Sequence, residues 1–309
     1  MTLPAIQCED LTRHYGDIRA VEGLNISVQK GSIFGFLGRN GAGKTTTIRM
    51  LTGLTQPTRG CGWVNGIETT SADSQARRLF GYLPQSPAFY TWMTPLEYLK
   101  YCAQLFELPH NEINSRIQEV LDLVDLNQAK KRRIGGFSGG MLQRMGIAQA
   151  LVHSPTVLFL DEPTSALDPA GRYEVLDLIS RLRGQVTVFL SSHILSDIER
   201  VCDTVAILRS GELVLVAPRD DLLSQYATST AAITIEHGYN FPTEFIETIE
   251  KQSWMRNYSI DGEILRLSVD QVENARIPLF KLVADFQIPV VKYEWVRPTL
   301  EEIFLKLSA

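Results

Sequence analysis

The feature that most constrains the fold is a glycine-rich loop at residues 38–45, with the sequence Gly-Arg-Asn-Gly-Ala-Gly-Lys-Thr. It fits the pattern G-x-x-x-x-G-K-[ST], in which glycines let backbone N–H groups turn inward around phosphate oxygens. A short apolar run at 33–37 precedes the loop, and a helical pattern at 48–54 follows it. Since a helix N-terminus adds its positive end, this order predicts a phosphate-binding site on an α/β sheet.

The residues of this loop have different expected tasks. The Lys44 ammonium can reach the β- and γ-phosphates of a nucleotide, and the Thr45 hydroxyl can ligate Mg²⁺. Arg39 adds positive charge beside the phosphates. The candidate nucleotide-binding residues are therefore Gly38, Arg39, Asn40, Gly41, Ala42, Gly43, Lys44, Thr45 and Thr46.

Two adjacent carboxylates follow a second buried strand. The apolar run 157–160 ends in Asp161 and Glu162, and ligands of open α/β sheets bind at the carboxyl ends of the strands. Asp161 is expected to hold Mg²⁺ through water, and Glu162 to polarise the attacking water. An apolar run ending in two acids is a weak signal alone, but it becomes strong behind a phosphate-binding loop.

A second helix N-terminus can bind an anion. Ser138 is placed to cap a helix, and Gly139 and Gly140 leave the amides of its first turn uncovered. Taken alone, this segment is better explained as an ordinary capped helix.

Alternating strands and helices define the first part of the chain. Apolar runs at 157–160 and 186–190 flank a helical segment at 169–183, which is βαβ organisation with a mostly parallel sheet. The region from about 85 to 153 reads instead as successive helices. One of these is predicted to begin at Thr94, followed by Pro95 and the capping-box residue Glu97. The second, at 113–126, completes an all-helical insert.

The pattern changes after about residue 218, so we expect two domains, 1–218 and 219–309. The second domain holds 9 Lys and Arg against 14 Asp and Glu and so carries the whole net charge of −5. Its elements follow the order β-α-β-β-α-β, a small α+β domain. The predicted strands are 232–235, 254–260, 263–269 and 290–295, with helices at 243–252, from near Pro278, and from Pro298.

Read in chain order, these motifs resemble the ATP-binding subunit of an ABC transporter. Residues 38–45 match the family's Walker A motif, with Arg39 where proline is usual, and residues 157–162 match Walker B with its catalytic glutamate. Residues 138–143 match the ABC signature, which separates this family from other P-loop ATPases. Four further matches are the Q-loop glutamine Gln85, the D-loop at 165–168, the switch histidine His193 and the A-loop aromatic Tyr15.

The resemblance implies a P-loop ABC ATPase fold that includes an antiparallel β subdomain, with ATP and Mg²⁺ as ligands. It implies that Glu162, His193, Lys44 and Gln85 act in hydrolysis and that Thr45, Gln85 and Asp161 surround the metal. Tyr15 would stack on adenine, although an aromatic near an edge strand is often simply packed. The remaining nucleotide contacts implied by the family are Ser138, Gly139, Gly140, Gln143 and Asp168.

The family's arrangement also implies partners. The phosphate loop and the signature helix of one chain cannot close on the same nucleotide, so a second ATPase subunit, identical or homologous, would pair head to tail around two ATP molecules. Membrane-spanning permease subunits would receive the motion at the inner face of the cell membrane. The aromatic stretch 89–92 is the expected docking region, with core packing as the competing account. Residues 298–304 resemble the tail of ABC-2-type exporter ATPases of the drug-resistance kind.

Composition excludes several other classes. The net charge of −5 disfavours a nucleic-acid binder, and the four cysteines include no C-x-x-C pair, so neither a zinc site nor a disulfide framework is indicated. No run approaches the roughly 20 apolar residues of a membrane span, and no signal segment is evident. We therefore expect a cytoplasmic chain. The alternative is a soluble ABC ATPase that serves a non-membrane machine, but only one P-loop and no long coiled coil are present.

Overall fold

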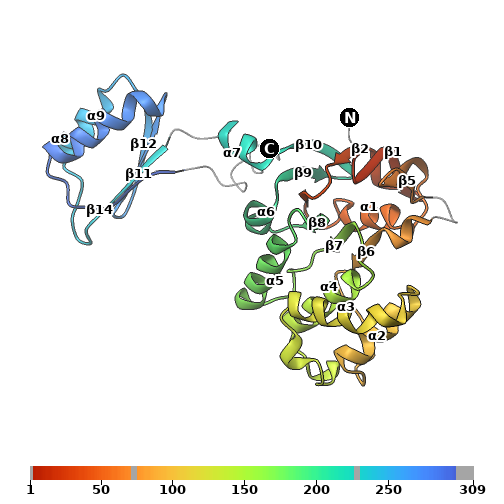
Figure 1. Cartoon of the computed structure of the whole chain (residues 1–309). Helices are drawn as coiled ribbons and strands as arrows, with labels where there is room; N and C mark the ends of the chain where they lie inside the picture. The colour runs from red at the N-terminus through yellow and green to blue at the C-terminus, as the bar shows by residue number, and fades with distance from the viewer. Residues whose placement is uncertain (1–2, 71–74, 226–229, 297–309) are drawn as a thin grey trace. The chain divides into compact units, whose positions relative to one another are not determined.

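A computed structural model describes residues 3–70, 75–225 and 230–296 of the chain. The chain divides into two compact units, Met1–Arg219 and Asp220–Ala309 (Figure 1). Among the residues that the structure describes, no helix is long and apolar enough to cross a membrane.

A six-stranded sheet forms the centre of the first unit, in the order β10-β9-β3-β8-β7-β6. Strands β9, β3, β8, β7 and β6 run parallel, and β10 is antiparallel to β9. Every residue of β3 and β7 is buried, as expected for strands covered on both faces. The mostly parallel sheet predicted from the sequence is thus confirmed. The strands are β3 (Ile33–Leu37), β6 (Phe80–Leu83), β7 (Val157–Asp161), β8 (Thr187–Ser192), β9 (Thr204–Arg209) and β10 (Glu212–Pro218).

A second sheet in this unit is antiparallel and has the order β2-β1-β4-β5. It shares one hydrophobic core with the central sheet, in which Leu11 and Leu24 lie with Phe34 and Phe36. The antiparallel β subdomain expected from the family resemblance is therefore present. Its strands are β1 (Ile6–Tyr15), β2 (Ile18–Val28), β4 (Arg59–Val64) and β5 (Ile67–Glu68).

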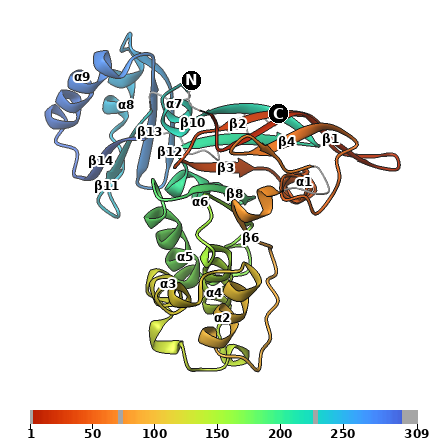
Figure 2. The same ribbon diagram turned by 45° about the vertical axis from the view of Figure 1, so that its right-hand side comes forward.

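Helices α2, α3 and α4 gather at one end of this unit in both views (Figures 1 and 2), as the all-helical insert predicts. Thr94 and Glu97 form the expected capping box at the start of α2. Helix α4 lies so close to β6 that a Cβ atom on Gly81 would collide with the carbonyl oxygen of Ala150. The helices of the unit are α1 (Lys44–Leu51), α2 (Pro95–Leu105), α3 (His110–Leu123), α4 (Gly139–Leu151), α5 (Pro169–Arg181) and α6 (Leu195–Val201).

The second unit has the predicted order β-α-β-β-α-β, preceded by α7 (Arg219–Gln225). Its antiparallel sheet has the order β12-β13-β11-β14, and α8 and α9 cover one face of it (Figure 1). Phe245 and Leu279 of these helices share a core with Ile233 and Leu265 of the sheet. The elements are β11 (Thr230–Ile235), α8 (Thr243–Glu250), β12 (Met255–Asp261), β13 (Ile264–Val269), α9 (Val272–Asp285) and β14 (Val290–Val296).

One predicted boundary in this unit is wrong. Helix α9 begins at Val272, and Pro278 lies inside it rather than at its first turn. Ala275, Leu279 and Val283 are all buried on the core, and their four-residue spacing places them on one helix face. Packing of this face extends the helix through the proline. The predicted final helix from Pro298 lies outside the described residues.

Candidate nucleotide and hydrolysis site

The phosphate loop has the local geometry that its glycines allow. Gly41 and Gly43 have φ values of 82° and 106°, in the region where glycine carries no steric penalty. A Cβ atom on Gly43 would also collide with the carbonyl oxygen of Ala20. Residue 43 therefore accepts only glycine, and helix α1 begins directly after it at Lys44.

Lys44 is folded back onto its own loop. Its ammonium donates to the carbonyl oxygens of Gly38 at 2.7 Å and Arg39 at 3.2 Å, and it forms an ion pair of 2.9 Å with the Glu162 carboxylate. Both side chains of this pair are only 6% exposed. Lys44 thus has a carboxylate of its own chain as its negative partner, in the place where a phosphate could also supply negative charge.

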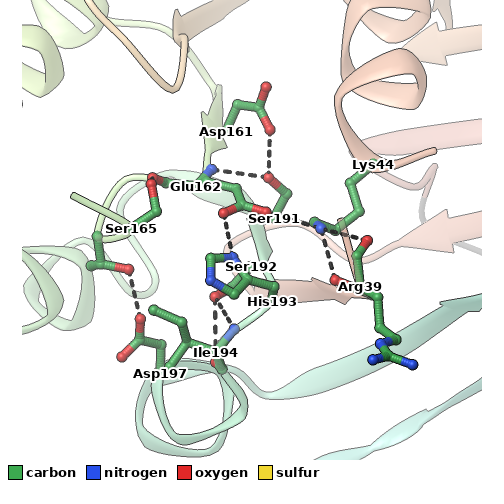
Figure 3. Close-up of polar contacts among 12 residues, drawn as sticks. Arg39, Lys44, Asp161, Glu162, Ser165, Ser191, Ser192, His193, Ile194 and Asp197 are labelled. Atoms are coloured by element: carbon green, nitrogen blue, oxygen red, sulfur yellow. Dashed lines mark hydrogen bonds and ion pairs between the residues drawn. The ribbon is translucent and has the colours of Figure 1, made fainter. Parts of the chain in front are cut away.

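Glu162 is held in an unusual backbone conformation just beyond the end of β7. Its φ is 48°, and non-glycine residues in the left-handed region are uncommon and tend to occur at functional sites. The hydroxyl of Ser191 accepts from the Glu162 amide at 3.0 Å. The Glu162 carboxylate also lies 2.5 Å from Nδ1 of His193, as Figure 3 shows. Glu162 thus joins Lys44 on one side and His193 on the other.

Two of the three candidate metal ligands, Thr45 and Asp161, meet between α1 and β7, and among the described residues neither forms a hydrogen bond with the third, Gln85. The Thr45 hydroxyl donates to Oδ1 of Asp161 at 3.2 Å, and the Ser191 hydroxyl donates to the same oxygen at 2.7 Å. Asp161 is 1% exposed. A hydroxyl and a carboxylate fit Mg²⁺, which prefers oxygen ligands and usually takes only one or two carboxylates beside phosphates and water. The described residues hold no cluster of three or more His, Cys, Asp or Glu side chains that could cage a metal by themselves.

Ser138 caps helix α4 as predicted. Its hydroxyl accepts from the amide of Met141 at 3.3 Å, and Ser138 and Gly139 are exposed while Gly140 is buried. The Cβ of an alanine at Gly140 would lie 3.4 Å from the Cα of Gly171 in α5. The first turn of α4 is therefore exposed at its tip, at Ser138 and Gly139, and packed against α5 at Gly140.

Gln143 and Gln85 contact each other in the same chain. Gln143 is 5% exposed, and its Nε2 donates to the carbonyl oxygen of Gln85 at 3.4 Å. Gln85 is exposed, two residues beyond β6. Gln143, which the family resemblance assigns to the nucleotide, is thus buried against the Q-loop. The sequence did not predict this contact between the two glutamines.

Two further predicted residues make local contacts. Tyr15 ends β1 and is 42% exposed, with the Arg13 guanidinium 4.4 Å from its ring centroid. Asp168 is exposed and caps α5 by accepting from the Gly171 amide at 3.1 Å. The residues that the structure brings together are Lys44, Thr45, Asp161, Glu162 and His193.

Ser191 is a site residue that the sequence analysis missed. It is fully buried and binds both the Asp161 carboxylate and the Glu162 amide. The signal was the pair Ser191-Ser192 at the end of an apolar strand, directly before His193, because a buried hydroxyl needs a hydrogen-bond partner. Fold and site together define a P-loop ATPase that carries an ABC signature.

Comparison with known proteins gives the family. Residues 21–165 match the family described as ABC transporter. The chain is 38% identical to the bacitracin transport ATP-binding protein BcrA of Bacillus licheniformis, over 98% of this chain and 96% of that protein. It is 31% identical to the linearmycin resistance ATP-binding protein LnrL of Bacillus subtilis, over 98% of each. A solved ATP-binding subunit of an ABC transporter aligns with a TM-score of 0.64 and 30% identity, over 72% of this chain and 93% of that one.

The chain therefore belongs to the ATP-binding proteins of ABC transporters. It is an ABC-type ATPase, and the family to which it belongs hydrolyses ATP.

Proposed function

We propose that this chain powers an exporter, working as a head-to-tail dimer that holds Mg²⁺ and ATP between two subunits at the cytoplasmic face of a membrane. The observation that supports the dimer is that, among the described residues, no hydrogen bond or ion pair joins the phosphate loop to the start of α4. Lys44, Glu162 and His193 meet at the phosphate loop. The Ser138 hydroxyl instead accepts a hydrogen bond from the Met141 amide of its own helix, α4. A second subunit would complete the site.

Hydrolysis in this proposal starts with the release of Lys44. Phosphate oxygens compete with Glu162 and with the Gly38 carbonyl for the Lys44 ammonium, so ATP binding frees the Glu162 carboxylate. Glu162 then orients a water and accepts its proton as the water oxygen bonds to the γ-phosphorus and the bond to ADP breaks. His193 holds the carboxylate from the opposite side at 2.5 Å. Thr45 and Asp161 would hold Mg²⁺, which would supply positive charge to the phosphates when bound.

The aromatic stretch at 89–92 supports docking of a membrane subunit. Tyr90 and Trp92 are 49% and 63% exposed, and their ring centroids are 5.8 Å apart. Tyr101 of α2 adds a third partly exposed ring, 6.0 Å from Tyr90. Exposed aromatic groups of this kind mark binding surfaces, and a cytoplasmic helix of a permease would be the partner here. The export direction rests on the relatives whose names link them to bacitracin transport and linearmycin resistance.

Complementation between two inactive variants tests the shared site. Lys44→Ala removes the phosphate contact, and Ser138→Arg blocks the exposed first turn of α4. In a head-to-tail dimer, a mixed pair keeps one intact site, so an equal mixture should recover about a quarter of the wild-type ATPase activity. A mixture that stays as inactive as its components contradicts the shared site. Co-purification of the chain with a multi-span membrane protein tests the transporter against the alternative of a non-membrane machine.

A further inference from the structure

A buried carboxylate lies outside the motifs that match the ABC transporter family. Asp197 is in the first turn of α6, four residues after His193, and is 1% exposed. Burying an ionised carboxylate is costly unless it is paired and hydrogen-bonded. Its partners therefore determine which segments are held beside the switch histidine.

The partners of Asp197 come from two other segments. Its Oδ2 accepts from the Thr164 hydroxyl at 2.6 Å, and its Oδ1 accepts from Nε of Arg172 at 2.5 Å. Arg172 also donates from Nη2 to the hydroxyl of Ser196 at 2.7 Å. One carboxylate thus joins the turn after β7, the first turn of α5 and the start of α6. We call these three residues, Asp197, Thr164 and Arg172, the acidic clip.

The acidic clip holds both ends of the D-loop at 165–168. Thr164 directly precedes the loop and is 2% exposed, and its carbonyl accepts from the amide of Leu167 at 3.2 Å. Arg172 follows the loop, and its amide donates to the carbonyl of Asp168 at 2.9 Å. A displacement of this loop therefore moves two groups that bind Asp197.

Short hydrogen-bonded steps lead from Asp197 to the hydrolysis site. The Asp197 amide donates to the Ile194 carbonyl at 3.2 Å, and the Ile194 amide donates to the Ser192 hydroxyl at 2.9 Å. His193 lies between these two residues and contacts Glu162 at 2.5 Å. Figure 3 shows Asp197 and Ile194 on the segment that continues from His193.

We propose that Asp197 is a positioning residue that sets His193 against Glu162 according to the position of the D-loop. This inference rests on the proposed function, in which a second subunit closes on the nucleotide that the family resemblance assigns to Asp168, the last residue of the D-loop. When that subunit displaces the D-loop, Thr164 and Arg172 would shift Asp197 and, through it, the switch histidine. The two sites of the dimer would thereby influence each other's hydrolysis.

Asp197→Asn is the first variant for the test. Its amide oxygen still accepts from Thr164, but it carries no charge for Arg172. Since small misplacements in a catalytic arrangement lower rates strongly, we expect kcat to fall by at least about tenfold. The KM for ATP should stay within about twofold, because the clip does not touch the phosphate loop, and the Hill coefficient for ATP should fall to about 1.

Arg172→Gln tests the same ion pair from the side of the arginine. This position should tolerate substitution better than Asp197, since the Arg172 side chain is 30% exposed. The double variant Asp197→Asn, Arg172→Gln can form a neutral amide pair. We expect it to be no slower than either single variant, which is the non-additivity of two groups acting as one unit. If Asp197→Asn fails to fold, the fall in kcat and Hill coefficient of Arg172→Gln decides the question.

Asp203→Asn is the matched control. Asp203 also pairs with an arginine, Arg183, and accepts from the amide of Ile33 at 2.8 Å, but Ile33 begins β3 at the end away from the phosphate loop. This variant should lose stability and keep the wild-type kcat and Hill coefficient.

The outcomes separate this inference from the proposed function. Asp197→Asn or Arg172→Gln with wild-type kcat and Hill coefficient overturns the positioning role and leaves the dimer intact. A loss of stability alone, as expected for Asp203→Asn, counts as the same result. A wild-type chain that hydrolyses ATP without cooperativity, and whose inactive variants do not complement, overturns the shared site instead.

Discussion

The ion pair between Lys44 and Glu162 predicts that removing the acid tightens nucleotide binding. The two groups lie 2.9 Å apart and are 6% exposed, and breaking a buried pair typically costs about 3–5 kcal/mol. In Glu162→Gln the Lys44 ammonium keeps the Gly38 and Arg39 carbonyls and gains a neutral amide. Before nucleotide is added, the variant should therefore be less stable than the wild type by about 1–2 kcal/mol, which is part of the cost of breaking a buried pair. A bound phosphate restores a negative partner to Lys44, so the affinity should rise by about 5- to 30-fold.

Titration calorimetry with MgADP is the appropriate assay. ADP presents its β-phosphate to Lys44 but lacks the γ-phosphate, so its affinity reports on the ion pair apart from subunit pairing. His193→Ala is the control, because it removes the other contact of Glu162 and leaves the Lys44 pair in place. We expect it to bind ADP within about twofold of wild type. Equal or weaker ADP binding by Glu162→Gln would refute the competition between Glu162 and phosphate.

Three further perturbations test other parts of the structure. Ser138→Ala removes the cap of α4 and should cost about 1 kcal/mol, measured by denaturant unfolding without nucleotide. Gly81→Ala places a Cβ against the carbonyl of Ala150 and should cost more than about 2 kcal/mol in the same assay, unless α4 moves. Burial lowers the pKa of His153. Its contribution to stability is thus full above pH ~6.5 and is lost as the pH falls toward the lower folded pKa, so unfolding of His153→Gln should depend less on pH between about 7.5 and 5.5.

Much of the hydrolysis site could be predicted from the sequence because local motifs determine it. The glycines of the phosphate loop follow β3, the two acids lie at the end of β7, and His193 follows β8. The carboxyl ends of parallel strands meet at one edge of a sheet. The meeting of Thr45, Asp161, Glu162 and His193 follows from this topology.

The contacts that the sequence did not reveal depend on tertiary packing. Gln143 reads as an exposed signature residue, but α4 is buried on nearly every side, with Met145, Ile147 and Ala148 in the core. Asp197 reads as a surface acid of a short helix, and only its buried partners distinguish it. The pairing of Lys44 with Glu162 joins two motifs that are far apart in the sequence, and neither motif alone predicts it.

The left-handed backbone of Glu162 limits how the acid can be presented. With φ at 48°, the chain turns where β7 would otherwise continue, and the Glu162 carboxylate contacts Lys44 and His193. The Ser191 hydroxyl accepts a hydrogen bond from the Glu162 amide at this turn and donates one to the neighbouring Asp161 carboxylate. Glu162, the proposed water-activating residue, and Asp161, the proposed metal ligand, therefore bind the same hydroxyl on the neighbouring strand, and any shift of β8 would displace both together.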